Sequence, residues 1–375
     1  MNFEYSEDQL VFKDSVIKYL QDQYDFEKRQ SIVKSDEPFD QNVWAQTAEL
    51  GWLYMPFSEE QGGFGGSAVD TILFFEQFGK HLVVEPFLET LVLTGGVLRR
   101  VENSLSEQYL ARLMVGELQG AVAHFEAQSR GDLTRISTSA VEQGEGYVLN
   151  GKKAVVYNAP EAQLLIVSAL LPDDRGMGLF LVEADVEGLV LQSYPTVDGR
   201  VAADICLQDV MVPSVTLLAE GDQAASILED TYNEALLALT AEMVGAMDVL
   251  LQTTVDYTKE RKQFGTPISK FQVLQHHMAD MFMAAELARS LMYAAAIKVR
   301  DGDADASAFV AAAKAKADKC AKQVAHSAVQ LHGGIATTEE LNVGHYLKRI
   351  TVAANLFGST QYHIQRYQQL TSAEK

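Results

Sequence analysis

The sequence predicts an α+β fold in which a helical domain, a small β domain and a helical bundle follow one another along the chain. Three compositional zones support this prediction. Residues 1–118 show helical periodicity. Residues 119–228 break into short segments rich in Val, Ile and Tyr with turn residues between them, a pattern typical of antiparallel strands. Residues 229–375 return to long helical patterns, and we expect these three ranges to be the domains.

The N-terminal zone contains signals for where its helices begin and end. Its opening segment repeats apolar residues at helical spacing: Leu10, Val11, Val16, Ile17 and Leu20. Asp40 and Asn42 precede a second helix, which ends near Gly51. A glycine run at residues 62–66 predicts a loop, after which Ser67 or Asp70 begins the next helix.

The two later zones also contain signals for turns and for the ends of helices. Turn residues at 144–146 and 150–151 predict hairpins in the β domain. Four helical runs are expected in the last zone, at about residues 230–259, 271–299, 305–331 and 341–354. Gly333 and Gly334 end the third run. Helices of this length with Ala and Met on their inner faces are typical of an antiparallel four-helix bundle.

Charge and cysteine content exclude several classes of function. The chain of 375 residues has a net charge of -21, which repels nucleic acid and anionic membrane surfaces. Its two cysteines, Cys206 and Cys320, have neither metal-ligand nor disulfide spacing and favour a reducing compartment. The N-terminal residues carry acids where a signal peptide needs bases and an apolar run, and no stretch of 18 apolar residues occurs. We therefore expect a cytoplasmic protein that does not enter a membrane.

Two C-terminal motifs are ambiguous when each is considered alone. Residues 260–265 could be a charged helix end that is stopped by glycine, and residues 330–334 could be another helix end. His332 and the pair His276–His277 lack further ligands at metal-binding spacing, so no metal site is predicted.

Considered together, ordered segments along nearly the whole chain resemble the acyl-CoA dehydrogenase family. The segments are EYSEDQLVFKDSVIKYL, ELGWLYMPFSEEQGGFGG, VLNGKKAVVYNA, DICLQDVMVP, ERKQFGTPISKFQ and QLHGG. The resemblance implies the family's three-domain fold, a tetramer, an FAD held across a subunit interface, and α,β-desaturation of an acyl-CoA thioester. It also implies an electron-transferring flavoprotein as the electron acceptor.

The resemblance assigns FAD-binding roles that suit the residue types. Arg261 can offer a charge-assisted fork to the pyrophosphate, Phe264 an aromatic surface, and Gln272 both a donor and an acceptor. The second motif adds Gln330, Leu331, Gly333 and Gly334; further candidates are Glu126, Asn158 and Gln361. In the family these C-terminal residues serve an FAD that is held mainly by a neighbouring subunit.

The catalytic base of the family is missing at both of its usual positions. The reaction removes a proton from Cα of the thioester, and a positioned carboxylate normally accepts that proton. Counting without gaps from Gln330 places Phe357 at the first position, and counting back from Arg261 places Ala235 at the second. Glu234 adjoins the second position, but one residue turns a helical side chain by about 100°. No catalytic residue is therefore assigned, and Glu234 remains the one alternative base.

Other replacements fall on the same half of the site. Family threonines near the flavin ring correspond to Phe125 and Tyr157, and the arginine that meets CoA corresponds to Leu236. Residues that serve a neighbour's FAD are kept, whereas those that serve the chain's own flavin, base and substrate are lost. We infer that the chain resembles the base-lacking subunit of heteromeric dehydrogenases of bacterial steroid and bile-acid side-chain breakdown. Such a subunit completes the FAD site of a base-bearing paralogue.

Alternative interpretations stay open from sequence alone. The chain could be a self-sufficient homotetrameric dehydrogenase that uses Glu234 as its base. Nitroalkane oxidation, a sister activity on the same fold, is a weaker alternative, because the carboxylate base that it needs is missing from this chain as well. A third possibility is a flavin-free scaffold subunit, which the presence of Arg261 and Gln272 disfavours.

Overall fold

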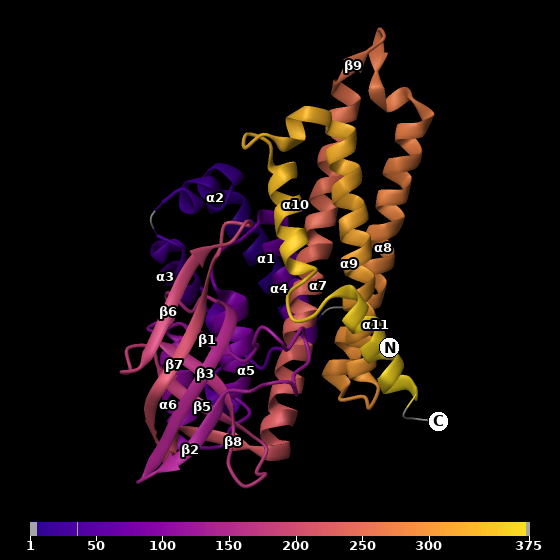
Figure 1. Ribbon diagram of the computed structural model, residues 1–375. Helices are drawn as coiled ribbons and strands as arrows, with labels where there is room; N and C mark the ends of the chain where they lie inside the picture. Colours follow the sequence, from indigo (N-terminus) through magenta and orange to yellow (C-terminus); the bar gives the residue numbers. More distant parts are fainter. Residues whose placement is uncertain (1–5, 36, 373–375) are drawn as a thin grey trace. The chain divides into compact units, whose positions relative to one another are not determined.

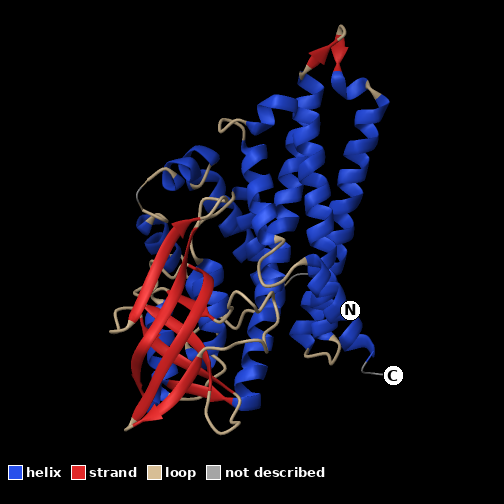
Figure 2. Ribbon diagram, viewed as in Figure 1, coloured by secondary structure: helices blue, strands red, loops and turns tan. Residues whose placement is uncertain are grey.

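The contacts of the chain group into two compact units, a helical unit and a sheet unit, whose helices and strands are labelled in Figure 1. The computed structural model describes residues 6–35 and 37–372. The helical unit consists of Met1–Ser31, Ser67–Val83 and Leu236–Lys375, and the sheet unit consists of Ile32–Gly66 and Val84–Ala235. The order of the elements along the chain confirms the predicted succession of helices, strands and helices, and Figure 2 shows the helices and the sheet. The predicted domain boundaries after residues 118 and 228 stay a prediction.

Long helices make up the helical unit. They are α1 (Glu7–Gln23), α4 (Ala68–His81), α8 (Gln272–Asp301), α9 (Ala306–His332), α10 (Asn342–Ala353) and α11 (Thr360–Ser372). Two more helices, α2 (Phe26–Val33) and α7 (Gly221–Glu260), continue from one unit into the other. The four predicted C-terminal runs are present as α7 to α10. α7 begins about nine residues earlier than predicted because nothing in that stretch breaks a helix, and α11 was not predicted.

The sheet unit is built around one mostly antiparallel sheet. Its strands are β1 (Gly120–Ala123), β2 (Ser139–Gln143), β3 (Gly146–Tyr157), β4 (Leu164–Leu170), β5 (Met177–Glu183), β6 (Leu189–Pro195), β7 (Val201–Pro213) and β8 (Leu217–Glu220). The order is β6-β7-β3-β2-β4-β5-β8, and β1 adds to β4 in parallel. Its helices are α3 (Gln41–Glu49), α5 (Gly95–Leu98) and α6 (Ser104–Met114), with a π-helix at Leu88–Thr94. The small two-stranded ribbon of β9 (Lys262–Gln263) and β10 (Thr266–Pro267) belongs to the helical unit.

Helix caps follow the sequence signals. Asp40 Oδ1 accepts a hydrogen bond from Asn42 N at 2.8 Å and caps α3 as expected. Of the two residues proposed to begin α4, Ser67 is the N-cap, and its own N–H donates to Asp70 Oδ2 at 2.8 Å. This reciprocal pairing is a capping box, so both residues fix the start of the helix.

Two glycines let α4 and α7 approach closely within the helical unit. A Cβ at Gly79 would lie 2.0 Å from the carbonyl oxygen of Glu242, and one at Gly245 would lie 2.0 Å from that of Glu76. The Glu242 carboxylate turns toward α10, where Arg349 donates to both of its oxygens at 2.7 and 2.6 Å. Backbone contact on one side and a buried bidentate ion pair on the other therefore hold α7 in place.

A buried polar cluster joins three strands in the core of the sheet unit. Lys153 Nζ donates to Glu126 Oε1 at 2.9 Å, to Ser168 Oγ at 3.1 Å and to the carbonyl oxygen of His124 at 3.1 Å. His124 Nδ1 lies 2.9 Å from Ser168 Oγ. Glu126 accepts further hydrogen bonds from the backbone and hydroxyls of Ser137 and Thr138. Glu126, a candidate FAD contact in the sequence, is therefore fully engaged inside the chain.

Burial sets the protonation states in this cluster. Burial, and then the charge of Lys153, lower the pKa of His124 to about 3. Burial also lowers the pKa of Lys153 to about 8, against the pull of Glu126. Burial alone would raise the pKa of Glu126, but its hydrogen bonds and Lys153 outweigh this and hold it below the ordinary value. Near neutral pH the cluster thus holds a neutral imidazole and a charged pair.

We predict that His124 makes the protein acid-labile. Its pKa is about 6.5 in the unfolded chain and about 3 when folded, so the unfolded state binds the extra proton. Stability is therefore lost as the pH falls between these values, by about 1.4 kcal/mol per pH unit for this one proton. Chemical denaturation at several pH values should give a shallower slope for His124→Gln than for the native chain. The exposed His326 is the control; an identical slope in His124→Gln and His326→Gln would contradict the prediction.

Candidate functional site

An aromatic cluster surrounds Phe125, which the resemblance aligns with a flavin-facing threonine of the family. Phe125 is the second residue after β1 and packs edge-on against Tyr232 of α7, with ring centroids 5.1 Å apart. His124 lies 5.0 Å from Phe125 and 5.8 Å from Tyr232 by the same measure. Tyr232 is 2% exposed, and its burial raises the pKa of its phenol. Side chains of the chain itself therefore fill the space beside Phe125.

The residue that the resemblance aligns with the second flavin-facing threonine, Tyr157, is the last residue of β3. Tyr157 is half-buried, and the next residue, Asn158, has a left-handed backbone with a φ of 61°. The Asn158 amide donates to Gln119 Oε1 at 3.3 Å and to the carbonyl oxygen of Gly120 at 3.4 Å. Asn158, which the sequence proposed as an FAD contact, thus has both hydrogen bonds within the sheet unit.

Glu234 is held by two arginines at the end of α5. Arg100 Nη2 donates to Glu234 Oε1 at 2.7 Å, and Arg99 Nη2 donates to Oε2. Arg99 also donates to the carbonyl oxygen of Pro56. Burial lowers the pKa of Arg99, and the Glu234 carboxylate opposes that shift. Both carboxylate oxygens are therefore engaged in ion pairs, which is a poor state for a base that must reach a substrate proton.

The two expected base positions lie in different units. Ala235 is fully buried in the sheet unit. Phe357 is in the helical unit, in the turn between α10 and α11, with a φ of 58°. Gly358 follows with a φ of 117°, and a Cβ there would lie 2.5 Å from the ring of Tyr362. Phe357 and Gly358 both have a left-handed backbone, but the Phe357 side chain is a hydrocarbon ring that cannot accept a proton.

A second cluster of buried polar side chains lies next to this turn. Lys314 Nζ donates to Asp318 Oδ1 at 2.7 Å, and Thr360 Oγ1 donates to Oδ2 at 3.2 Å. His363 is fully buried nearby on α11, and its burial lowers its pKa to about 3. Lys314, Asp318 and His363 are fully buried, and the bond from Thr360 to Asp318 fixes the start of α11.

The C-terminal cofactor candidates have the opposite character. Arg261 is exposed at the base of the β9–β10 ribbon, and Phe264 at its tip is 91% exposed with a φ of 53°. Gln272 is the first residue of α8, and Gln330 is exposed near the end of α9. Among the described residues, none bonds through a hydrogen bond or ion pair to the side chains of Arg261, Gln272 or Gln330.

This arrangement fits an anionic dinucleotide. Arg261 supplies an unpaired cation, and the N-terminus of α8 adds partly positive backbone N–H groups at Gln272. Gly333 and Gly334 are exposed, and a Cβ on either would have no atom within 4 Å, so a ligand can approach their backbone closely. Leu331 is half-buried beside them, and Gln361 is exposed on α11.

His332 in the same motif has a structural role. Its Nδ1 donates to the carbonyl oxygen of Ala328 at 2.8 Å, and its ring stacks on Tyr257 with centroids 4.4 Å apart. Burial lowers the pKa of His332, so the ring is neutral. The described residues contain no group of three His, Cys, Asp or Glu side chains placed to hold a metal ion. None of their helices combines the length and hydropathy needed to span a bilayer.

Sequence reasoning missed Arg99, Arg100 and Tyr232. The arginines are 134 and 135 positions away from Glu234 along the chain, so no local pattern links them. Tyr232 lies on a helix whose start was placed close to it, with no signal that its ring would meet Phe125.

Comparison with known proteins gives matches along nearly the whole chain. Three family models match in order: the acyl-CoA dehydrogenase N-terminal domain at residues 6–117, the middle domain at 121–210 and the C-terminal domain at 226–369. A probable acyl-CoA dehydrogenase of Bacillus subtilis, YngJ, is 30% identical over 93% of both chains.

Solved structures are also similar over almost the full length. The Tcur3481–Tcur3483 steroid ACAD is 28% identical, with a TM-score of 0.89 over 98% of both chains. The FAD complex of PigA is 27% identical, with a TM-score of 0.92 over 100% of both. The expectation of FAD as the cofactor of this fold is thereby confirmed. The three matching domains and the relative of 30% identity establish that the chain belongs to the acyl-CoA dehydrogenase family.

Proposed function

We propose that this chain is the base-lacking subunit of a heteromeric, FAD-dependent acyl-CoA dehydrogenase. The observation that carries the proposal is a contrast between two sets of residues. Arg261, Gln272 and Gln330, which grip FAD in the family, are exposed and unpaired within the described chain. Phe125, at a position that would serve the chain's own flavin, is packed against Tyr232, and Glu234, the alternative base, is paired with two arginines.

The chemistry explains why a partner is needed. Desaturation removes a proton from Cα of the thioester, and FAD, when bound, accepts the hydride from Cβ. Phe357 cannot accept a proton, Ala235 has no polar atom, and Glu234 has both oxygens bound by arginines. The base must therefore come from a paralogous subunit, which also holds the substrate acyl chain.

This chain contributes residues that bind FAD. The Arg261 guanidinium neutralises the pyrophosphate, and the exposed ring of Phe264 covers an apolar part of the cofactor. Gln272 and Gln330 offer hydrogen bonds, while Leu331, Gly333 and Gly334 let the cofactor approach the backbone. Gln361 is a further contact, whereas the contacts of Glu126 and Asn158 within the chain give those two a structural role.

The relatives support this assembly and a substrate class. The similar steroid ACAD carries two protein names, Tcur3481 and Tcur3483, which suits a paralogous pair. We assign a tetramer with half as many FAD molecules as chains, an acyl-CoA with a lipid or steroid acyl group, and an electron-transferring flavoprotein as the acceptor. The desaturation belongs to lipid or steroid catabolism.

Glu234→Gln should leave the turnover of the two-subunit enzyme unchanged. It removes the charge that pairs with Arg99 and Arg100, so the free energy of unfolding should fall by about 1–3 kcal/mol. Turnover assays and thermal unfolding measure the two effects. Glu145→Gln, an exposed carboxylate in a β-hairpin turn, is the matched control. Loss of turnover in Glu234→Gln alone would restore the self-sufficient homotetramer with Glu234 as base.

Arg261→Ala should weaken FAD binding to the assembled enzyme, so that the flavin is lost on purification. Loss of a charge-assisted phosphate contact costs about 1.5–3 kcal/mol, which weakens FAD binding about ten- to hundredfold. Flavin content after gel filtration and a titration with FAD measure the effect. Arg300→Ala, which removes an exposed cation paired with Asp301, should not change it. Full flavin content in the Arg261→Ala complex would mean that this chain does not help to bind the FAD, as expected of a flavin-free scaffold subunit.

A further inference from the structure

Two cofactor motifs of the helical unit are joined by one tyrosine. Arg261 follows the last residue of α7, and Gly333 follows the last residue of α9. Both helices end toward the β9–β10 ribbon, at the same end of the helical unit (Figure 1). Tyr257 lies in the last turn of α7 and contacts both motifs. Its backbone contacts the first motif, and its side chain contacts the second.

The backbone of Tyr257 holds the start of the Arg261 motif. The Tyr257 carbonyl oxygen accepts a hydrogen bond from Arg261 N at 2.8 Å. The Arg261 carbonyl oxygen in turn accepts from Ile268 N at 2.8 Å, which closes the base of the ribbon. The Arg261 backbone is therefore fixed relative to the last turn of α7.

The side chain of Tyr257 holds the start of the glycine motif. Its hydroxyl donates to the carbonyl oxygen of His332 at 3.3 Å, and its ring stacks on the His332 ring with centroids 4.4 Å apart. His332 is the last residue of α9, so the hydroxyl acts on the peptide that leads into Gly333. Gly333 has a φ of 70° and a ψ of -148°, which glycine adopts without steric cost. Tyr257 therefore determines where the turn at Gly333 and Gly334 lies.

The hydrogen bonds of His332 do not account for the position of its ring. Because Nδ1 donates to the carbonyl oxygen of Ala328, Nε2 is the acceptor of the neutral imidazole. Nε2 is buried and has no hydrogen-bond partner among the residues that the structure describes. A buried unpaired acceptor destabilises a fold, and sequences keep such a group mainly where function requires it. What the ring provides in this position is the stack with Tyr257.

We propose that Tyr257 is a positioning residue for FAD, which holds Arg261 and the Gly333–Gly334 turn at the spacing that one dinucleotide requires. Without the hydroxyl, the ends of α7 and α9 lose the bond that joins them, and the two motifs are aligned less of the time. A binding site that is less well organised in advance binds its ligand more weakly. The inference rests on the proposed function, because it takes both motifs to bind the same FAD.

The FAD affinity of the assembled enzyme tests the proposal. Tyr257→Phe removes the hydroxyl and keeps the ring, so FAD binding should weaken about two- to fivefold, as expected for loss of one uncharged hydrogen bond. Titration of the flavin-free complex with FAD measures the effect. In an Arg261→Ala background the effect of Tyr257→Phe should be smaller, because the alignment of the two motifs matters less when one is absent. Equal fold-changes in both backgrounds would overturn the proposal.

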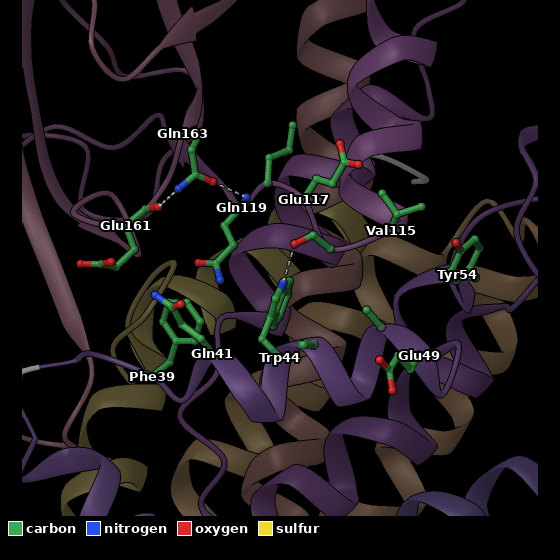
Figure 3. Close-up of a pocket in the computed structure, with 14 residues that line it drawn as sticks. Phe39, Gln41, Trp44, Glu49, Tyr54, Val115, Glu117, Gln119, Glu161 and Gln163 are labelled. Carbon is green, nitrogen blue, oxygen red and sulfur yellow. Dashed lines mark hydrogen bonds between the residues drawn. The ribbon is translucent and has the colours of Figure 1, made fainter.

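A control variant separates positioning from loss of stability. Trp44 Nε1 also donates to a backbone carbonyl oxygen at 3.3 Å, that of Gly116. This bond lies at a pocket of about 540 Å³ whose described lining residues all belong to the sheet unit (Figure 3). Trp44→Phe should lower the free energy of unfolding and leave FAD affinity unchanged. Equal losses of FAD affinity in Trp44→Phe and Tyr257→Phe would mean that Tyr257 contributes only to stability.

The isolated chain gives a readout that requires neither FAD nor a partner. Amide hydrogen exchange at residues 333–337 should be faster in Tyr257→Phe than in the native chain, whereas exchange in the middle of α8 should not change. Unchanged exchange at residues 333–337 would overturn the proposal. If Arg261→Ala weakens FAD binding and Tyr257→Phe does not, this inference alone fails. If Arg261→Ala has no effect on FAD binding, the proposed function fails and this inference fails with it.

Discussion

One buried ammonium group, that of Lys153, determines the path of the chain around Phe125 in the sheet unit. Lys153 on β3 binds the carbonyl oxygen of His124, the carboxylate of Glu126 and the hydroxyl of Ser168. It therefore fixes the chain on both sides of Phe125. An unpaired buried charge is costly, so these contacts cannot relax independently. With its neighbours fixed, the Phe125 ring packs against Tyr232 of α7.

The two sets of functional residues differ in how far the chain itself satisfies them. In the sheet unit, Glu126, Asn158 and Glu234 all have hydrogen bonds or ion pairs within the chain. In the helical unit, Arg261 and Gln272 have none among the described residues. Polar groups that remain solvated until an assembly forms are available for a ligand that another subunit holds. Loss of a single catalytic residue would not produce this division, whereas specialisation of one subunit for binding would.

Local signals in the sequence predicted the fold well. The caps at Asp40 and Ser67 and the four long C-terminal helices depend on neighbouring residues, which a sequence displays directly. α11 was missed because its mostly polar residues lack a strong apolar stripe.

The site could be predicted only in part. The motif residues Arg261 and Gln330 were identified by resemblance, and their exposure agrees with the proposed role. The pairing of Glu234 with Arg99 and the contact of Phe125 with Tyr232 join distant segments, so they required the structure.

We propose that this chain grips FAD without forming a complete flavin site of its own. The most direct measurement is the molar ratio of FAD to chain, by absorbance of the released flavin. The ratio should be measured for the purified chain alone and after co-expression with a base-bearing paralogue. We expect almost no flavin in the first preparation and about half an FAD per chain in the second, with thioester desaturation only in the second. One FAD per chain in the isolated protein, together with desaturation, would contradict it.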